Sequence, residues 1–161
     1  MMKQKFLSFL KPFSTMPALF MLCIIFGFSA QTGETSGNLS YHISYEIVEF
    51  GNNLFDLEMD ETDLSHYAHT IETPIRKLAH MAEYFLLTIF VLFPFYVYGL
   101  RGVRLFLTTG LLCVIFAGLD EFHQYFVSER SASVIDVGID SIGIGCALLI
   151  AKIGGRISSN L

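Results

Sequence analysis

The stretch LFLTTGLLCVIFAGLDEFHQYFVSERSASVIDVGIDSIGIGCALLIA (residues 105–151) places charged side chains between two apolar runs. No charged residue occurs in 105–119 or in 141–151, whereas Asp120, Glu121, Arg130, Asp136 and Asp140 lie between them. A helix of about 20 apolar residues crosses the roughly 30 Å hydrocarbon core of a bilayer. The stretch therefore predicts two membrane spans, and it raises the question of why charges stand where the spans meet.

The composition of the whole chain also indicates a membrane protein. Hydrophobic residues make up 53% of the 161 positions and charged residues only 16%, against about 25% charged residues in typical globular domains. Apolar runs of sufficient length occur at about 12–30, 78–100, 105–126 and 134–151. We therefore expect an all-α bundle of four transmembrane helices, forming a single domain over 1–161.

The basic residues near the span ends predict the orientation. They lie before the first span, between the second and third spans, and after the fourth: Lys3, Lys5, Lys11, Arg101, Arg104, Lys152 and Arg156. Because Lys and Arg concentrate on the cytoplasmic side of membrane proteins, both termini are predicted to be cytoplasmic. The 31–75 segment and the 127–133 loop would then face outward. Arg76, Lys77 and Arg130 lie on the outer side, against this rule.

The outer segment 31–75 is acidic and has helical periodicity. It contains nine acidic residues and no Lys or Arg. Apolar residues recur every three to four positions in two groups, Leu39, Ile43, Ile47, Phe50 and Leu64, Tyr67, Ala68, Ile71. Gly51-Asn52-Asn53 between them is typical of a break. The pattern predicts two short amphipathic helices that cap the outer face.

The helical rise places polar residues of three spans at a similar depth. At about 1.5 Å per residue, Asp120 and Asp136 each lie roughly 6 Å below the outer edge of the hydrocarbon core, and Asp140 about 12 Å below it. His80 and Glu83 lie ~5 Å and ~9 Å along the second span from Lys77. Because unpaired charge in a bilayer is costly, a functional site is the default explanation for such a cluster.

The residues of this predicted site come from all three spans and the last loop. The ligand-binding candidates are Arg76, Lys77, His80, Glu83, Tyr84, Asp120, Glu121, Gln124, Arg130, Asp136 and Asp140. The side chains suited to acid–base catalysis among them are His80, Glu83, Asp120 and Glu121.

Four motifs carry a resemblance to a known family. IRKLAHMAEYFLL (75–87), LDEFHQYFVSER (119–130), VIDVGIDSIG (134–143) and FSAQTGETS (28–36) resemble segments of the VanZ-like membrane proteins, named for a teicoplanin-resistance determinant of Gram-positive bacteria. The resemblance implies a multi-pass protein of the bacterial plasma membrane and places family positions at Lys77, His80, Glu83, Tyr84, Asp120, Glu121, Gln124, Arg130 and Asp136. The family more usually has Asn where this chain has Asp140, so the cluster holds an additional acid.

Three functions fit these residues. Arg76, Lys77 and Arg130 suit an anionic head group of an envelope lipid or lipid-linked cell-wall precursor, which the protein would bind or modify at the outer leaflet. Such a role would be compatible with an effect on teicoplanin susceptibility. No nucleic-acid partner is expected, and the oligomeric state is left open.

Two alternatives remain at this point. The acids and His80 offer oxygen and nitrogen ligands for a divalent metal in a hydrolase or transferase, although no H-E-x-x-H motif occurs and no metal ligands are assigned. Alternatively, Lys77 and Arg130 neutralise Asp120, Glu121 and Asp136 in a purely structural network that fixes the helix register.

Overall fold

The computed structural model describes residues 11–157, and within them every regular element is a helix. The elements are η1 (Lys11–Phe13), α2 (Met16–Ser29), α3 (Gly33–Phe55), α4 (Glu61–Val97), α5 (Gly102–Gln124) and α6 (Val134–Ile157). Four helical segments are long and apolar enough to cross a membrane: Lys11–Ser29, α4, α5 and Val134–Gly154 of α6. The predicted all-α class with four spans is confirmed.

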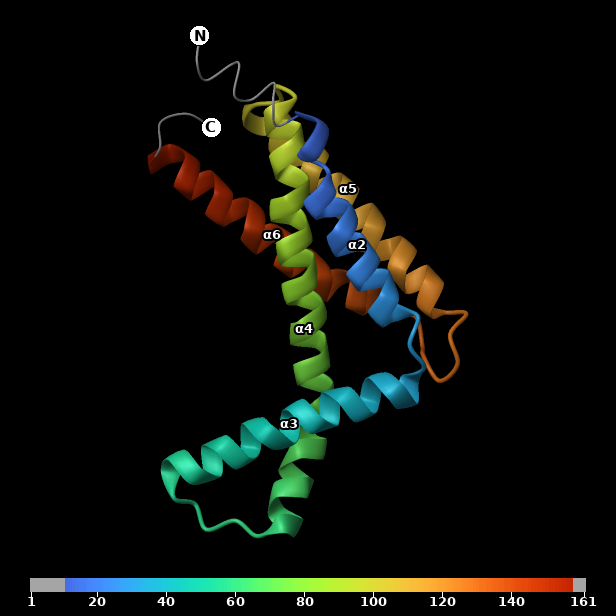
Figure 1. The fold of residues 1–161 in the computed structure, drawn as a ribbon, viewed down its shortest axis with the longest axis vertical. Helices are drawn as coiled ribbons and strands as arrows, with labels where there is room; N and C mark the ends of the chain where they lie inside the picture. Colours follow the sequence, from blue (N-terminus) through green and yellow to red (C-terminus); the bar gives the residue numbers. More distant parts are fainter. Residues whose placement is uncertain (1–10, 158–161) are drawn as a thin grey trace.

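Helix α4 is the central element of the bundle, because α2, α5 and α6 all pack against it (Figure 1). The buried core between these helices includes Ile25, Leu87, Cys113 and Ala117. Helix α6 crosses α4 obliquely at Gly143, where an added Cβ would lie 2.1 Å from the Met81 carbonyl oxygen. Such close approach of backbones is what small residues permit between membrane helices.

The connections between the spans lie at two ends of the bundle (Figure 1). The start of α2, the α4–α5 turn and the end of α6 share one end, and the α2–α3 and α5–α6 connections lie together at the other. This second end, which α3 adjoins, is called the α3 end below. Because the number of spans is even, the start of α2 and the end of α6 lie at the same end. That the α3 end faces outward stays a prediction from the Lys and Arg distribution.

The outer segment is helical as predicted, but its boundaries differ from the predicted ones. Helix α3 continues through Gly51-Asn52-Asn53 and ends at Phe55. Asn52 accepts hydrogen bonds from the residues that follow this end. The Asn52 carbonyl accepts from the Leu57 N–H at 3.2 Å, and its side chain accepts from the Met59 N–H at 3.1 Å. Asp56 takes the left-handed conformation, with φ 53°, that commonly follows a helix C-terminus.

The second amphipathic stretch is not a separate helix. It forms the first turns of α4, which begins after Asp60 and runs without interruption through Pro74 into the membrane span. The Asp60 side chain caps this helix by accepting from the Asp63 N–H at 2.9 Å. The last part of the outer segment, from Glu61 onward, is therefore continuous with the second span.

Helix α3 crosses the first half of α4 (Figure 1). The Tyr41 hydroxyl lies 3.1 Å from Ser65 Oγ, and its ring centroid is 4.4 Å from that of His69. Ser40 and Ser44 are buried, and each donates to the carbonyl four residues earlier in its own helix. The predicted apolar stripe of α3, by contrast, is exposed: Leu39, Ile43, Ile47 and Phe50.

Candidate functional site

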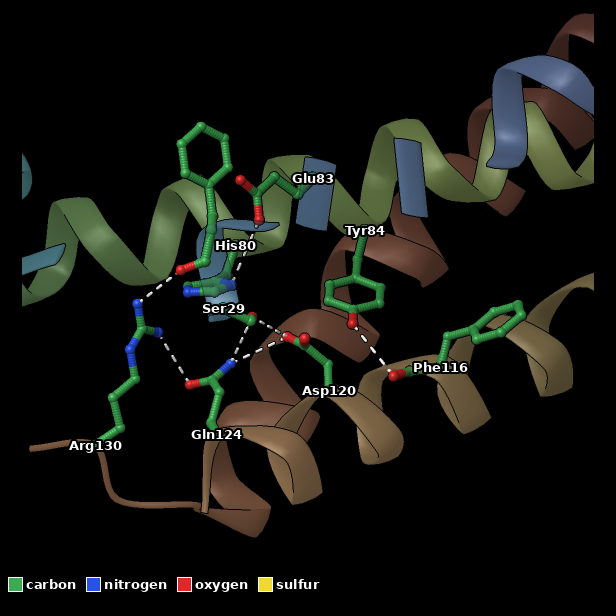
Figure 2. Close-up of polar contacts among 9 residues, drawn as sticks. Ser29, His80, Glu83, Tyr84, Phe116, Asp120, Gln124 and Arg130 are labelled. Atoms are coloured by element: carbon green, nitrogen blue, oxygen red, sulfur yellow. Dashed lines mark hydrogen bonds and ion pairs between the residues drawn. The ribbon is translucent and has the colours of Figure 1, made fainter. Parts of the chain in front are cut away.

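Arg130 fastens the α5–α6 loop to the end of α2. Its Nε donates to the Gln31 carbonyl at 3.0 Å and its Nη2 to the Phe28 carbonyl at 3.1 Å. Its Nη1 donates to Gln124 Oε1 at 3.2 Å (Figure 2). Burial, followed by the neighbouring Arg76 guanidinium, lowers the pKa of Arg130, although an arginine stays protonated in proteins. Within residues 11–157, Arg130 is held by these hydrogen bonds and makes no ion pair with an acid.

The start of α3 is attached to the same loop. The Gly33 N–H donates to the Ser128 carbonyl at 3.0 Å, and the Glu34 N–H donates to Glu129 Oε2 at 3.0 Å. A Cβ at Gly33 would lie only 2.1 Å from the Glu129 carbonyl oxygen. Glycine is therefore required at position 33 for the two connections to meet.

A buried polar network continues inward from Arg130. Gln124 Nε2 donates to Ser29 Oγ at 3.1 Å and to Asp120 Oδ2 at 3.0 Å, and Ser29 Oγ donates to Asp120 Oδ2 at 2.8 Å (Figure 2). Asp120 is only 1% exposed, and its Oδ1 has no hydrogen-bond partner. Asp120 and Gln124 are four residues apart and therefore lie on the same face of α5.

Ser29 and Gln31 were not among the predicted site residues. They lie at the end of α2 and in the following turn, and they contact residues more than 90 positions later in the chain. The FSAQTGETS motif at 28–36 was the signal that could have pointed to them.

A cavity of about 150 Å³ lies at the α3 end, between α4, α6 and the α5–α6 loop. Most of the predicted ligand-binding residues line it: Arg76, Lys77, His80, Glu121, Gln124, Arg130, Asp136 and Asp140. Gly33, Glu129, Ser131 and Ile139 complete the lining. We call this space the polar cavity. Residues of three spans and one loop thus meet as the depth estimate predicted.

The charged groups of the polar cavity differ in how they are paired. Lys77 Nζ lies 2.5 Å from Asp136 Oδ1, and Glu121 Oε2 accepts from the Ser133 N–H at 2.8 Å. Arg76 and Asp140 make no hydrogen bond or ion pair with any residue in the described range 11–157. Asp140 is nevertheless only 3% exposed. The cavity therefore contains one cation and one buried acid that are both available to a ligand.

A second cavity of about 190 Å³ adjoins the first, between α2, α3 and α4. Most of its exposed wall is apolar surface, with Phe28, Leu39, Ile43, Ile75 and Ala79 as the apolar residues, while Gln31, Ser36, Ser40 and Glu83 add polar groups. We call this space the apolar cavity. The two cavities share three lining residues, Arg76, His80 and Arg130.

Three predicted residues lie outside the polar cavity. Glu83 lines the apolar cavity, with its Oε2 3.5 Å from His80 Nδ1 (Figure 2). Tyr84 is fully buried in the core and its hydroxyl lies 3.4 Å from the Phe116 carbonyl oxygen. Asp120 lies behind Gln124 and lines neither cavity.

The four catalytic candidates are therefore divided among different surroundings. His80 borders both cavities, Glu83 only the apolar one and Glu121 only the polar one, while Asp120 is enclosed between α2 and α5. Across the described residues, no three His, Cys, Asp or Glu side chains are grouped so that they could hold a metal ion. The donor geometry gives no support to the metal-dependent alternative.

Four spanning helices with a polar cavity at one end define a multi-pass helical membrane protein. The model of the VanZ/LLP1 family matches residues 15–155, and the chain therefore belongs to this family. The resemblance inferred from the four motifs is thus confirmed. No curated protein and no solved structure matches this chain.

Proposed function

We propose that this VanZ/LLP1 family member binds the anionic head group of an envelope lipid or lipid-linked cell-wall precursor at the outer face of the bacterial plasma membrane. The observation that carries the proposal is Arg76, which borders both cavities and has no partner among the described residues. A charged side chain at the edge of a membrane span is costly unless something neutralises it. A phosphate or carboxylate would do so, and the planar guanidinium binds either one bidentately.

The other two cations support Arg76 rather than replace it. Lys77 is occupied by Asp136, and Arg130 donates three hydrogen bonds to the protein. A guanidinium has five N–H groups, so Arg130 retains two of them for a ligand. Arg76 alone of the three keeps its full set of donors.

The apolar cavity favours an amphiphile over a free anion. It begins at the same Arg76, His80 and Arg130 that border the polar cavity, and its remaining walls are mostly hydrocarbon. A lipid with its anionic group at Arg76 could therefore place the first part of an acyl or prenyl chain beneath α3. Glycopeptide antibiotics act on cell-wall precursors outside the membrane, so an effect on teicoplanin susceptibility would follow from binding such a precursor.

Mass spectrometry of the lipids that co-purify with the protein tests this proposal. We expect the wild-type protein to retain a phosphate- or carboxylate-bearing lipid, and Arg76→Gln to reduce its occupancy by about tenfold or more, since a hydrogen bond to a charged group contributes about 1.5–3 kcal/mol. Arg104→Gln is the matched control, because Arg104 is exposed at the start of α5, away from both cavities. Equal occupancy in wild type and Arg76→Gln would refute the proposal.

A structural role is the second candidate, and the hydrogen bonds of Arg130 favour it. They join α2, α5 and the loop without any ligand. The Arg76→Gln variant distinguishes lipid binding from a purely structural role. Arg76→Gln protein that accumulates and folds normally but loses lipid indicates binding, whereas loss of folded protein indicates that the charge network only stabilises the bundle.

A further inference from the structure

We propose that the ligand is zwitterionic, with a primary ammonium group that binds Asp140 and an anionic group that binds Arg76. This inference rests on the proposed function and specifies the chemical class of its ligand. It is carried by Asp140, a buried acid that lines the polar cavity, and by the order in which the two cavities present their groups.

Asp140 is a buried acid that has no hydrogen-bond or ion-pair partner within residues 11–157. It lies one helical turn beyond Asp136, is 3% exposed and lines the polar cavity. Lys77, which lines the same cavity, is bound to Asp136 at 2.5 Å and is not paired with Asp140. Burying a carboxylate is unfavourable unless a charge or donor compensates it. A ligand ammonium supplies both a positive charge and three N–H donors.

The charge of the polar cavity also disfavours a ligand that is only anionic. Besides His80, its lining contains three basic side chains, Arg76, Lys77 and Arg130, and four acidic ones, Glu121, Glu129, Asp136 and Asp140. An anion alone would add to this excess of acid. A head group with one negative and one positive charge leaves the balance unchanged and places each charge beside its opposite.

The arrangement of the cavities fixes the order of the ligand's parts. The apolar cavity would hold the chain, the shared wall at Arg76 the anionic group, and the polar cavity the ammonium. Chain, phosphate and primary amine follow one another in this order in an aminophospholipid. A cavity volume of about 150 Å³ admits a group the size of benzene, so an ethanolamine-sized group fits.

Native mass spectrometry of the full chain in competition with defined lipids tests this inference. The probes are phosphatidylethanolamine, its N-acetyl derivative and phosphatidylglycerol, all with the same acyl chains. We expect the wild-type protein to prefer phosphatidylethanolamine over the other two by tenfold or more. Asp140→Asn should abolish this preference while phosphatidylglycerol still binds. Asp63→Asn is the matched acid-to-amide control, because Asp63 is exposed at the start of α4 and lines neither cavity, and it should retain the preference.

The outcomes separate the inference from the proposed function. Equal binding of all three lipids by the wild type, or an unchanged preference in Asp140→Asn, would overturn the zwitterionic ligand and leave anionic lipid binding intact. No binding of any of them by the wild type would overturn both. The wild-type comparison alone decides the inference if Asp140→Asn fails to fold.

Discussion

The close contact between α4 and α6 at Gly143 predicts that the substitution Gly143→Ala, which adds one methyl group, lowers the stability of the protein. In Gly143→Ala the new Cβ would lie 2.1 Å from the Met81 carbonyl oxygen, whereas ordinary contacts begin near 3.4 Å. The helices would therefore have to separate locally by about 1.3 Å. Overpacking of this kind costs about 1–3 kcal/mol. Lys77 and Asp136, whose 2.5 Å ion pair joins the same two helices, would be drawn apart as well.

Gly145→Ala is the matched control, because nothing lies within 4 Å of a Cβ at that position of the same helix. Each substitution removes a helical glycine, which favours the helix by about 1 kcal/mol, so the comparison isolates the contact. We expect Gly143→Ala to unfold more readily than Gly145→Ala by about 1–3 kcal/mol, measured by reversible denaturation in detergent micelles, and to retain less bound lipid. Equal stability of the two variants would refute the close approach of α6 to α4.

Three further predictions concern the α3 end. Arg130→Lys should destabilise the protein by about 1.5–3 kcal/mol, because Lys cannot reach the three acceptors together. The measurement is the rate of protease cleavage within residues 125–133, which should rise in the variant; the wild-type rate would contradict the prediction. Gly33→Ala should displace the α5–α6 loop from the start of α3. A Ser131→Cys substitution in the same protein should then react faster with a thiol reagent, and an unchanged rate would count against the contact between Gly33 and Glu129. A double-mutant cycle on Lys77 and Asp136 should give a coupling of only about 0.2–1 kcal/mol, because both side chains are roughly one-third exposed; a value well above this range would indicate a drier site.

The spans were predictable because each is a long apolar run, and the hydrophobic requirement of the bilayer acts on every residue of it. That polar residues of three spans lie near one another was predictable for a related reason. The helical rise is nearly constant, so counting residues from Lys77, Arg104 and Lys152 placed the polar side chains at one level. The structure brings most of them to the polar cavity.

Rise alone does not determine which neighbour a helix face meets. Tyr84, adjacent to Glu83 in sequence, points into the core, while Glu83 faces the apolar cavity. Asp120 is directed toward α2 and Glu121 toward the polar cavity. These directions depend on the rotation of each helix about its axis, which is set by packing against the other spans.

The FSAQTGETS motif marked the segment that holds Ser29 and Gln31, but it could not show which groups they bond, because their partners are distant in sequence. The predicted position of the break between the two outer helices was wrong for another reason. Gly and Asn are typical of breaks, but Asn52 is also suited to accept hydrogen bonds at a helix C-terminus, and the side chain is used in that way here. The pattern located the end of the helix only to within several residues.

The most direct measurement is a solid-state NMR distance between ¹⁵N-labelled arginine guanidinium groups and lipid ³¹P in native-like membranes. We expect a phosphorus–nitrogen correlation in the wild-type protein that is lost or much reduced in Arg76→Gln and unchanged in Arg104→Gln. No correlation in the wild type, or the same correlation in Arg76→Gln, would contradict the claim that Arg76 binds a lipid phosphate at the boundary of the two cavities.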